Sequence, residues 1–384
     1  MTAMARRRIV LAAGGTGGHM FPARALAREL LARGQSPILV TDKRGGGFGP
    51  DLADQVPTYH IPAAGYAGTD VLAKAGSLLK LGLGYLGARG ILRRVDPEAV
   101  VGFGGYAALP TCFAAAHKGI RLVLHEQNAV LGRANRVLAP RAQAIATSFP
   151  EVRGLRERDR AKLHRTGNPV RTSFVAVGRK PYAVADATGP LRLLVTGGSQ
   201  GARVFNELIP EAVSRLPESM RLRLAVSQQV RGTDFQRVRE LYAHTGADVE
   251  LRSFFDDLPE RLQNVHLVIA RAGASTVTEL AAAGRPAILV PYPFAADDHQ
   301  GANAAAVADA GAGWLLRQDD ATPETLAARL ESLFADPARL TAAADAARRF
   351  TEPKSAARLA ELVLGETNGA GNDTGRAAAR EVAA

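Results

Sequence analysis

The chain of 384 residues is long enough for two domains of ordinary size, and its 47% apolar residues suffice for two hydrophobic cores. Its single cysteine excludes an internal disulfide, and its first ten residues lack the apolar core of a signal peptide, which together favour the cytosol. The net charge of +11 suggests an anionic partner, whereas only 5% aromatic residues, not interleaved with the basic clusters, argue against nucleic acid.

The chain begins with a strand, a glycine turn and a helix. The apolar stretch 9–13 leads into "GGTGGHMFP" and the amphipathic run 23–31, which together indicate the first β-loop-α unit of a doubly wound fold. The turn lacks the glycine spacing of a dinucleotide fingerprint and the Gly-Lys-Ser/Thr of an NTPase phosphate loop. His19 lies at the start of the predicted helix. It either takes part in the chemistry of a site or is an ordinary, partly exposed histidine.

Further strands alternate with helical stretches, and the opening pattern returns halfway along as "LRLLVTGGSQGARVFNELIPEAVSRL". The pattern predicts strands at 37–41, 99–102, 121–125, 142–147, 223–227, 249–252, 267–270 and 287–290. It predicts helices at 323–334, 337–350 and 355–364. Two Rossmann-like halves are the economical interpretation.

Composition also predicts the domain boundaries. Residues 1–168 form the first domain, 169–190 a linker rich in glycine and proline, and 191–350 the second domain. Residues 351–365 form a helix that packs back on the first domain, and 366–384 a disordered tail. In two facing domains of this kind, the carboxyl ends of both sheets line one cleft, where ligands bind.

Five stretches fall at predicted strand ends or helix starts. They are "GGTGGHMFP", "GFGGYAALP", "LHEQNAVLGRANR", "GGSQGA" and "RAGASTVTELAAAGRPAILVPYPFAADDHQGANA". Glycine turns at helix N-termini suit a phosphate, because unsatisfied N–H groups and the helix dipole both favour negative charge. The polar run 125–128 suits a polyhydroxyl ligand such as a sugar, or else forms turn and cap interactions.

Glu279 has two interpretations. With Thr276 it fits a capping box, which the sequence alone favours, while a carboxylate at this place can also bind ribose hydroxyls. The chain has neither Asp-x-Asp nor His-Glu-x-x-His, so we expect no metal site and no cofactor. In an enzyme of this kind, arginine, hydroxyl and N–H groups would meet the charge of a leaving group.

The stretch 71–95 is apolar but carries Lys74, Lys80, Arg89, Arg93 and Arg94. An apolar surface rimmed by cations can sit on an anionic membrane surface. Packing as a core helix is the alternative, which the pattern alone favours, and five glycines argue against one regular helix.

Together these stretches resemble the MurG family of glycosyltransferases. "GGTGGH", "GGY", "HEQN", "GNPVR", "GGSQGA" and "ELAAAGRPAILVPYP" occur in the family's order, and the match extends from Arg7 to Leu364. The resemblance implies the GT-B fold, two Rossmann-like domains facing one cleft, with the acceptor on the N-terminal domain and the UDP-sugar on the C-terminal domain. It implies metal-free, inverting transfer from UDP-N-acetylglucosamine to the 4-hydroxyl of the muramoyl unit of lipid I, which forms lipid II for peptidoglycan.

The resemblance also implies roles for single residues. His19 is the general base, with Glu126 as the other candidate. The implied donor site comprises Thr16, Gly17, Gly18, Asn128, Arg171, Ser199, Gln200, Phe255, Arg271, Glu279, His299 and Gln300. The acceptor side comprises Tyr106 and Asn135. His299 stands where the family usually has the first glutamine of a Gln-Gln pair, so its contact with the donor stays open.

Two alternatives remain. A related GT-B enzyme that glycosylates another lipid, such as diacylglycerol, would share the fold but not the "HEQN" and "GGY" motifs. A nucleotide-sugar-binding protein without catalysis would need its catalytic half elsewhere. The partners implied are UDP-N-acetylglucosamine, lipid I, an anionic membrane surface and other cell-wall enzymes, with a peripheral location on the cytoplasmic face of the inner membrane.

Overall fold

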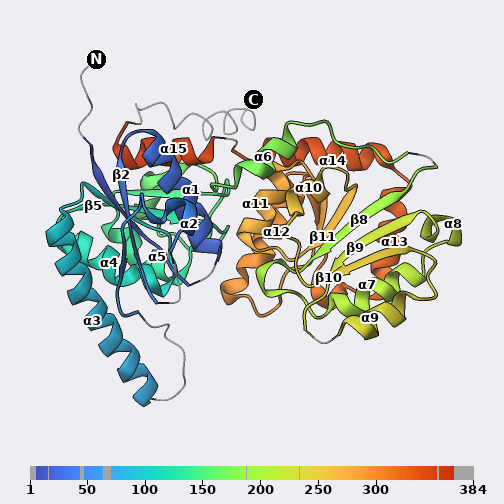
Figure 1. Cartoon of the computed structure of the whole chain (residues 1–384), viewed down its shortest axis with the longest axis horizontal. Coiled ribbons are helices and arrows are strands. Elements are labelled where there is room, and N and C mark those ends of the chain that lie inside the picture. The colour runs from blue at the N-terminus through green and yellow to red at the C-terminus, as the bar shows by residue number, and fades with distance from the viewer. Residues whose placement is uncertain are drawn as a thin grey trace. The chain divides into compact units, whose positions relative to one another are not determined.

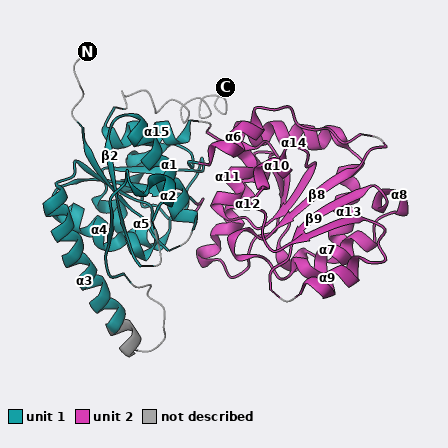
Figure 2. Cartoon of the chain, viewed as in Figure 1, with its two compact units in different colours: residues 1–127, 131–169, 354–384 teal, residues 128–130, 170–353 magenta. Residues whose placement is uncertain are grey.

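The computed structural model folds into two compact units (Figures 1 and 2). Unit 1 consists of residues 1–127, 131–169 and 354–384, and unit 2 of residues 128–130 and 170–353. The structure describes residues 6–15, 17–43, 47–63, 71–186, 188–232, 234–352 and 354–366, except for the side chains of 71–75. Apart from the short excursion at residues 128–130, the chain leaves unit 1 after residue 169 and returns to it at residue 354.

Unit 1 is built on a parallel sheet. In the described residues its strands are β1 (Arg8–Ala12), β2 (Ser36–Thr41), β3 (Thr58–His60), β4 (Ala99–Gly102), β5 (Arg121–Glu126), β6 (Ala144–Thr147) and β7 (Leu163–Arg165). Their order across the sheet is β3-β2-β1-β4-β5-β6-β7. Successive side chains of β1 enter opposite cores, Ile9 and Leu11 on one face and Val10 and Ala12 on the other.

Helices cover both faces of this sheet (Figure 1). They are α1 (Gly17–Ala32), α2 (Pro50–Ala53), α3 (Val71–Val95), α4 (Gly105–His117), α5 (Arg133–Leu138), α15 (Ser355–Leu364) and the 3-10 helices η1 (Ala139–Arg141) and η2 (Glu157–Lys162). Apolar side chains of α1 and α15 share one core, and those of α3, α4 and α5 share the other. Two covered faces explain why the strands read as continuous apolar runs.

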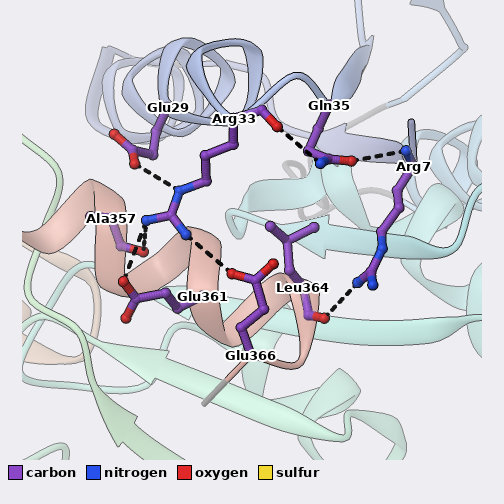
Figure 3. A network of polar contacts seen from close by, with 8 residues as sticks. All are labelled: Arg7, Glu29, Arg33, Gln35, Ala357, Glu361, Leu364 and Glu366. Carbon is purple, nitrogen blue, oxygen red and sulfur yellow. Dashed lines mark hydrogen bonds and ion pairs between the residues drawn. The ribbon is translucent and has the colours of Figure 1, made fainter. Parts of the chain in front are cut away.

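The C-terminal helix α15 is fixed on α1 by a polar network as well as by its apolar face (Figure 3). The Arg33 guanidinium donates to Glu29 at 2.8 Å, to Glu366 at 3.2 Å and to Glu361 at 3.4 Å. Arg7, directly before β1, donates to the carbonyl of Leu364 at 2.8 Å. One cation therefore joins α1 to two carboxylates of the C-terminal segment, and such partly exposed pairs contribute about 0.2–1 kcal/mol each.

Helix α3 is one regular helix despite its glycines, so the expected irregularity is wrong. A Cβ atom on Gly84 would overlap the carbonyl oxygen of Pro62, at 2.1 Å, so glycine there permits close packing. Its C-terminal half is buried through Ala88, Ile91 and Leu92. Nearer its N-terminus the helix exposes Leu78, Leu79, Leu83 and Leu86. The expectation of a core helix therefore holds only for the last turns, from Ala88 onward.

Unit 2 repeats the architecture. In the described residues its parallel strands are β8 (Leu191–Thr196), β9 (Leu224–Gln229), β10 (Asp248–Arg252), β11 (Leu267–Ala270), β12 (Ala287–Leu289) and β13 (Gly313–Leu315), in the order β10-β9-β8-β11-β12-β13. The first strand of each unit lies inside its sheet, with the next two strands on one side and the fourth on the other. The prediction of two Rossmann-like halves is confirmed.

The helices of unit 2 again lie on both faces of the sheet (Figure 1). They are α6 (Thr172–Gly178), α7 (Phe205–Ser214), α8 (Glu218–Arg221), α9 (Phe235–Tyr242), α10 (Leu258–Leu262), α11 (Ala274–Ala282), α12 (His299–Asp309), α13 (Pro323–Phe334) and α14 (Pro337–Phe350), with 3-10 helices η3 (Gly198–Gln200), η4 (Ala296–Asp298) and η5 (Gln318–Asp320). Helices α7, α9, α13 and α14 contribute to the main core of this unit.

Of the residues expected to form a linker, 169–190, all after Pro169 belong to unit 2 instead. Helix α6 buries Phe174 and Val177, and the Tyr182 hydroxyl donates to the carbonyl of His266 at 2.6 Å. The segment is rich in glycine and proline, which is why composition predicted a linker, but Phe174, Val177 and Tyr182 are buried. The tail expected at 366–384 lies outside the described residues after Glu366. No helix in the described ranges is both long and apolar enough to cross a membrane.

The return of α15 to unit 1 predicts a stability effect. Leu359 is fully buried in the core that α15 shares with α1, so Leu359→Ala should lower the free energy of unfolding by about 2–5 kcal/mol. Leu222→Ala, which truncates an exposed leucine of unit 2, is the matched control and should cost little. Urea denaturation measures both, and equal effects would contradict the assignment of α15 to this core.

Candidate functional site

Unit 1 gathers several residues singled out by the sequence around the ends of β1, β4 and β5. His19 lies in the first turn of α1, Tyr106 in the first turn of α4, and Glu126 is the last residue of β5. Asn135 on α5 turns back to Glu126. Parallel strands end at one edge of their sheet, which is where α/β proteins bind ligands.

His19 packs against the glycine turn between β4 and α4. Gly104 and Gly105 have φ angles of 85° and 71°, a left-handed conformation that glycine adopts without strain. A Cβ atom on Gly105 would come within 3.2 Å of the His19 ring. The turn therefore requires glycine both for its backbone conformation and to leave room for the imidazole.

A buried glutamine fixes the tautomer of His19. Gln127 Nε2 donates to the carbonyl of Phe103 at 3.1 Å and to His125 Nδ1 at 2.8 Å, so Gln127 Oε1 faces His19 Nδ1 at 3.1 Å. An amide oxygen only accepts, so His19 Nδ1 must carry the hydrogen. In the neutral ring, Nε2 is then the nitrogen that accepts a proton.

His125 completes this chain from the interior. Its Nδ1 accepts from Gln127, so its Nε2 carries the hydrogen and donates to the carbonyl of Gly167 at 3.3 Å. The pKa of His125 is lowered to about 4, chiefly by burial and in small part by the nearby His19, against the raising effect of the Gly167 carbonyl. His125 is therefore neutral at physiological pH and keeps the Gln127 amide in one orientation.

Glu126 is engaged by α5. Its Oε2 accepts from the backbone N–H of Gly132 and from Asn135 Nδ2, both at 2.9 Å. A carboxylate oxygen that already accepts two hydrogen bonds is less available to a substrate proton than a ring nitrogen. Asn135 is almost fully buried, and its Oδ1 has no hydrogen-bond partner among the described residues, so it can accept from a ligand hydroxyl.

In unit 2 the glycine turn after β8 is held by a buried glutamine. Gln229 Oε1 accepts from Thr196 Oγ1 at 3.0 Å and from the N–H of Gly197 at 3.1 Å. A Cβ atom on Gly197 would overlap the backbone of Gly201, at 2.2 Å, so the turn closes tightly. Ser199 is exposed at its tip.

The first turn of α11 lies beside this glycine turn. A Cβ atom on Gly198 would be 3.4 Å from Thr276 Oγ1. Ser275 Oγ is buried without a hydrogen-bond partner among the described residues. A helix N-terminus, a glycine turn and an unsatisfied hydroxyl together suit a phosphate group.

Glu279 does not cap its helix, so the capping interpretation is wrong. Helix α11 begins at Ala274 after Gly273, which provides no side-chain cap. Glu279 instead forms an ion pair with Arg171, whose Nη2 lies 2.9 Å from Glu279 Oε1. Burial raises the pKa of Glu279, and Arg171 opposes that rise by its charge and hydrogen bond.

Arg271 is directed into the protein. Its guanidinium donates to the carbonyls of Val290 and Pro291 at 3.1 and 2.9 Å and to Gln318 Oε1 at 2.7 Å. The Tyr292 ring lies 5.6 Å from the guanidinium carbon. Arg271 therefore shapes the loop after β12, and burial lowers its pKa.

Two amide side chains on the first turns of α12 hold the neighbouring loops. Gln300 Oε1 accepts from the N–H groups of Ala272 at 3.2 Å and Tyr292 at 3.0 Å. Asn303, one turn later and fully buried, accepts from the N–H of Ala129 at 2.8 Å and donates to Asn128 Oδ1 at 3.1 Å. Asn303 thereby orients Asn128, which belongs to unit 2.

The remaining predicted residues have less distinctive surroundings. His299 Nδ1 is bonded to the carbonyl of Ala296 at 2.8 Å. Phe255 is buried with the Arg261 guanidinium 4.6 Å from its ring centre. Gln200 is exposed beside Ser199, Gly17 and Gly18 open α1, and Thr16 lies outside the described residues.

The sequence analysis did not identify three residues that orient other groups of the candidate site, namely Gln127, Asn303 and Gln229. Gln127 was visible only as part of a polar run, and nothing in the sequence tied it to His19. Asn303 follows Gln300 by three positions, so helical spacing alone would have placed the two on one face. Gln229 is the last residue of β9, which lies next to β8 in the sheet. Its position beside the turn after β8 can be inferred only when the strand order is known.

The chemistry available divides between the units. Unit 1 provides His19, whose Nε2 can accept a proton, and Asn135, whose amide oxygen has no hydrogen-bond donor among the described residues. Unit 2 offers a phosphate-type turn and a buried carboxylate paired with arginine. Within the described ranges, no three histidine, cysteine or acidic residues come together in a way that could hold a metal ion.

Two models of one protein family match the chain, one in each half of the sequence. The N-terminal domain of glycosyltransferase family 28 matches residues 9–147, and the C-terminal domain of the same family matches residues 192–359. The first match extends from β1 to β6 and leaves out β7, and the second extends from β8 to β13.

Curated relatives match nearly the whole chain. A protein of Rhodospirillum centenum is 56% identical over 364 residues, covering 95% of both chains, and one of Paramagnetospirillum magneticum is 55% identical, covering 93% of this chain and 96% of its own. Both are named UDP-N-acetylglucosamine–N-acetylmuramyl-(pentapeptide) pyrophosphoryl-undecaprenol N-acetylglucosamine transferase. The crystal structure of Acinetobacter baumannii MurG is 30% identical, with a TM-score of 0.77, covering 94% of this chain and 99% of its own.

The buried histidine predicts acid sensitivity. The pKa of His125 is about 4 in the folded chain and about 6.5 when unfolded, so between these values the unfolded state binds more protons. The free energy of unfolding should therefore fall as pH drops from 6.5 to 4. His125→Asn should be less stable at neutral pH but lose less over this window.

His117→Asn, which changes an exposed histidine of α4, is the control and should keep the wild-type slope. Urea midpoints at several pH values measure all three proteins. A slope unchanged by His125→Asn would contradict the neutral assignment of His125.

Proposed function

The chain belongs to the MurG family of glycosyltransferases, and we propose that it transfers N-acetylglucosamine from UDP-N-acetylglucosamine to the 4-hydroxyl of the muramoyl unit of lipid I, forming lipid II. The observation that carries this function is 56% identity to a named relative over 95% of both chains. The relatives are named for a muramyl-linked undecaprenol acceptor, which favours lipid I over diacylglycerol.

We assign the role of general base to His19. The acceptor hydroxyl gives its proton to His19 Nε2 as its oxygen attacks C1 of the donor sugar, and the C1–O bond to UDP breaks with its electron pair leaving on the diphosphate. Attack opposite the leaving group converts the α-linked donor into a β-linked product. Gln127 supports this role because its Oε1 holds the Nδ1 hydrogen before and after the transfer.

Unit 1 would hold the acceptor through groups around His19. Asn135 Oδ1, buried and unsatisfied, accepts from a sugar hydroxyl, and Tyr106 lies in the adjoining turn of α4. Glu126 orients Asn135 by accepting from its Nδ2, so it acts as a positioning residue in this assignment. It remains the alternative base if His19 proves dispensable.

Unit 2 would hold the donor. The turn after β8, with Ser199 at its tip, and the first turn of α11 supply N–H and hydroxyl groups for the diphosphate, whose charge increases as the sugar leaves. Glu279 accepts from the ribose hydroxyls, and Arg171 opposes the rise that burial causes in the pKa of its carboxyl group. Gln300 Oε1 accepts from two backbone N–H groups, so its amide NH₂ is the group that can donate to the donor sugar.

We further propose that the protein is peripheral to the cytoplasmic face of the membrane and docks through α3. Leu78, Leu79, Leu83 and Leu86 are 50–66% exposed on this helix, with Lys80 among them and Arg93 and Arg94 in its last turn. Exposed leucines beside cations suit the boundary between the headgroups and acyl chains of an anionic bilayer.

The proposed base predicts a selective loss of turnover. With labelled UDP-N-acetylglucosamine and a short-chain lipid I analogue, wild type should form product in the presence of EDTA. His19→Ala should lose about 10²–10⁴-fold in kcat, the usual contribution of a general base. His117→Ala is the control.

Little loss in His19→Ala would transfer the base assignment to Glu126. No product from wild type would contradict the proposed function itself, and other lipid acceptors would then be compared. Product that disappears only with EDTA would contradict metal-free transfer.

The membrane assignment predicts that charge reversal weakens docking. Each cation near an anionic surface contributes about 1 kcal/mol, so Arg93→Glu with Arg94→Glu should weaken binding to phosphatidylglycerol vesicles at least about tenfold. Reversal of Arg179 and Arg349, exposed on unit 2, changes the net charge equally and should have little effect. Vesicle sedimentation measures both pairs, and equal binding would remove α3 from the account.

A further inference from the structure

Both arginines of the implied donor site are engaged within the protein. Arg171 forms an ion pair with Glu279, its Nη2 lying 2.9 Å from Oε1 of that carboxylate. Arg271 donates to two backbone carbonyls and to Gln318 Oε1. Neither guanidinium can turn to a diphosphate at the turn after β8 without giving up these bonds, so a further cation at that turn is of interest.

The end of β9 brings one such cation, Arg231, to the turn after β8. Strand β9 lies next to β8 in the sheet (Figure 1). Its last residue, Gln229, accepts from the N–H of Gly197 at 3.1 Å and so joins the strand to the turn. Val230 is fully buried, and its N–H donates to the carbonyl of Arg252 at 2.8 Å. The backbone that leads to Arg231 is therefore held on both sides.

The side chain of Arg231 runs over Gly201, which follows Ser199 and Gln200 in this turn. A Cβ atom on Gly201 would lie 3.4 Å from Cβ of Arg231, 3.2 Å from its Cγ and 2.8 Å from its Cδ. These distances shorten along the side chain, so the stem approaches the turn instead of leaving it for solvent. Gly201 has a φ angle of 74°, so glycine there both permits the conformation and leaves room for the stem.

The guanidinium of Arg231 has no counter-ion in the protein. Arg231 is exposed, and none of the residues that the structure describes forms a hydrogen bond or an ion pair with its side chain. The nearest acidic residue in the sequence, Asp234, accepts from Asn206 Nδ2 at 3.0 Å and faces Arg203 Nε at 3.9 Å. An arginine is charged at every physiological pH, and its N–H groups lie in one plane that matches two phosphate oxygens.

We propose that Arg231 binds the diphosphate of the donor at the turn after β8 and neutralises the charge that grows on it as UDP leaves. The inference rests on the proposed function, in which unit 2 holds the UDP-sugar. The electron pair of the broken C1–O bond goes to a diphosphate oxygen, while Arg231 stays protonated and donates hydrogen bonds only. The N–H groups of the turn and the Ser199 hydroxyl contribute dipoles, to which Arg231 adds a full positive charge.

The first test measures nucleotide binding and does not depend on turnover. Isothermal titration calorimetry compares UDP with uridine, which has no phosphate. Arg231→Ala should weaken UDP binding about tenfold or more, because a charged hydrogen bond is lost, and should leave uridine binding unchanged. Arg231→Lys should restore part of the UDP affinity by returning the charge without the planar pair of donors.

Arg203→Ala is the matched control. It removes the same charge two residues after Gly201, but the Arg203 side chain is 90% exposed and faces Asp234. Its charge is screened by solvent and salt, so UDP affinity should change little.

The second test measures transfer to a short-chain lipid I analogue. Arg231→Ala should lower kcat/KM for the donor about tenfold or more and leave the acceptor KM at the wild-type value. The kcat should fall as well, because the diphosphate carries more charge in the transition state than in the bound donor.

The outcomes separate this inference from the proposed function. Equal weakening of UDP and uridine in Arg231→Ala would overturn the inference, since Arg231 would then shape the loop and not bind phosphate. An equal loss of UDP affinity in Arg203→Ala would overturn it in favour of a diffuse charge effect. Unchanged UDP affinity in Arg231→Ala, with an active wild type, would overturn the inference alone. Weakened UDP binding in Arg231→Ala, with a wild type that forms no disaccharide, would support the inference and contradict the proposed function.

Discussion

The arrangement of parallel strands is the constraint on which every candidate group depends. Crossovers between parallel strands bring all carboxyl ends to one edge of each sheet, so residues far apart in sequence meet there. In unit 1 this edge joins the turn after β1, the turn after β4 and the end of β5, which carry His19, Gly105 and Glu126. In unit 2 the same edge joins the turn after β8 to the first turn of α11. The repeat of one topology thus provides two candidate sites with different side chains.

Buried amide side chains convert this topology into defined geometry. Gln127, Gln229 and Asn303 each satisfy backbone or side-chain groups on more than one segment, and each is at most 5% exposed. A buried amide left unsatisfied is costly, so its hydrogen bonds hold the loops in one arrangement. The consequence for function is greatest at Gln127, since its orientation decides which nitrogen of His19 can take a proton. The carbonyls of Phe103 and His125, together with Nδ1 of His125, accept from Gln127 Nε2 and hold that orientation.

The sequence predicted the elements that have a long apolar pattern and missed those that do not. The strand at 267–270 and the helices at 323–334 and 337–350 were predicted with the bounds that the structure has, because they are continuous buried or amphipathic runs. Strands β3, β7 and β13 were missed because they are three residues long and only partly buried, so they lack the continuous apolar run that revealed the equally short β12. Thr276 and Glu279 fit a capping pattern that the chain does not use, because α11 starts at Ala274. Motif order identified the family, but the roles of Gln127 and Asn303 arise only from tertiary contacts.

The central claim is a single displacement at the donor sugar with a base supplied by unit 1. The measurement that tests it most directly is the anomeric configuration of the disaccharide formed from UDP-N-acetylglucosamine and a short-chain lipid I analogue, read from the proton coupling of the new glycosidic centre. The account predicts a β-linked product from the α-linked donor. An α-linked product would contradict the single displacement, and release of free N-acetylglucosamine without disaccharide would contradict the assignment of the acceptor.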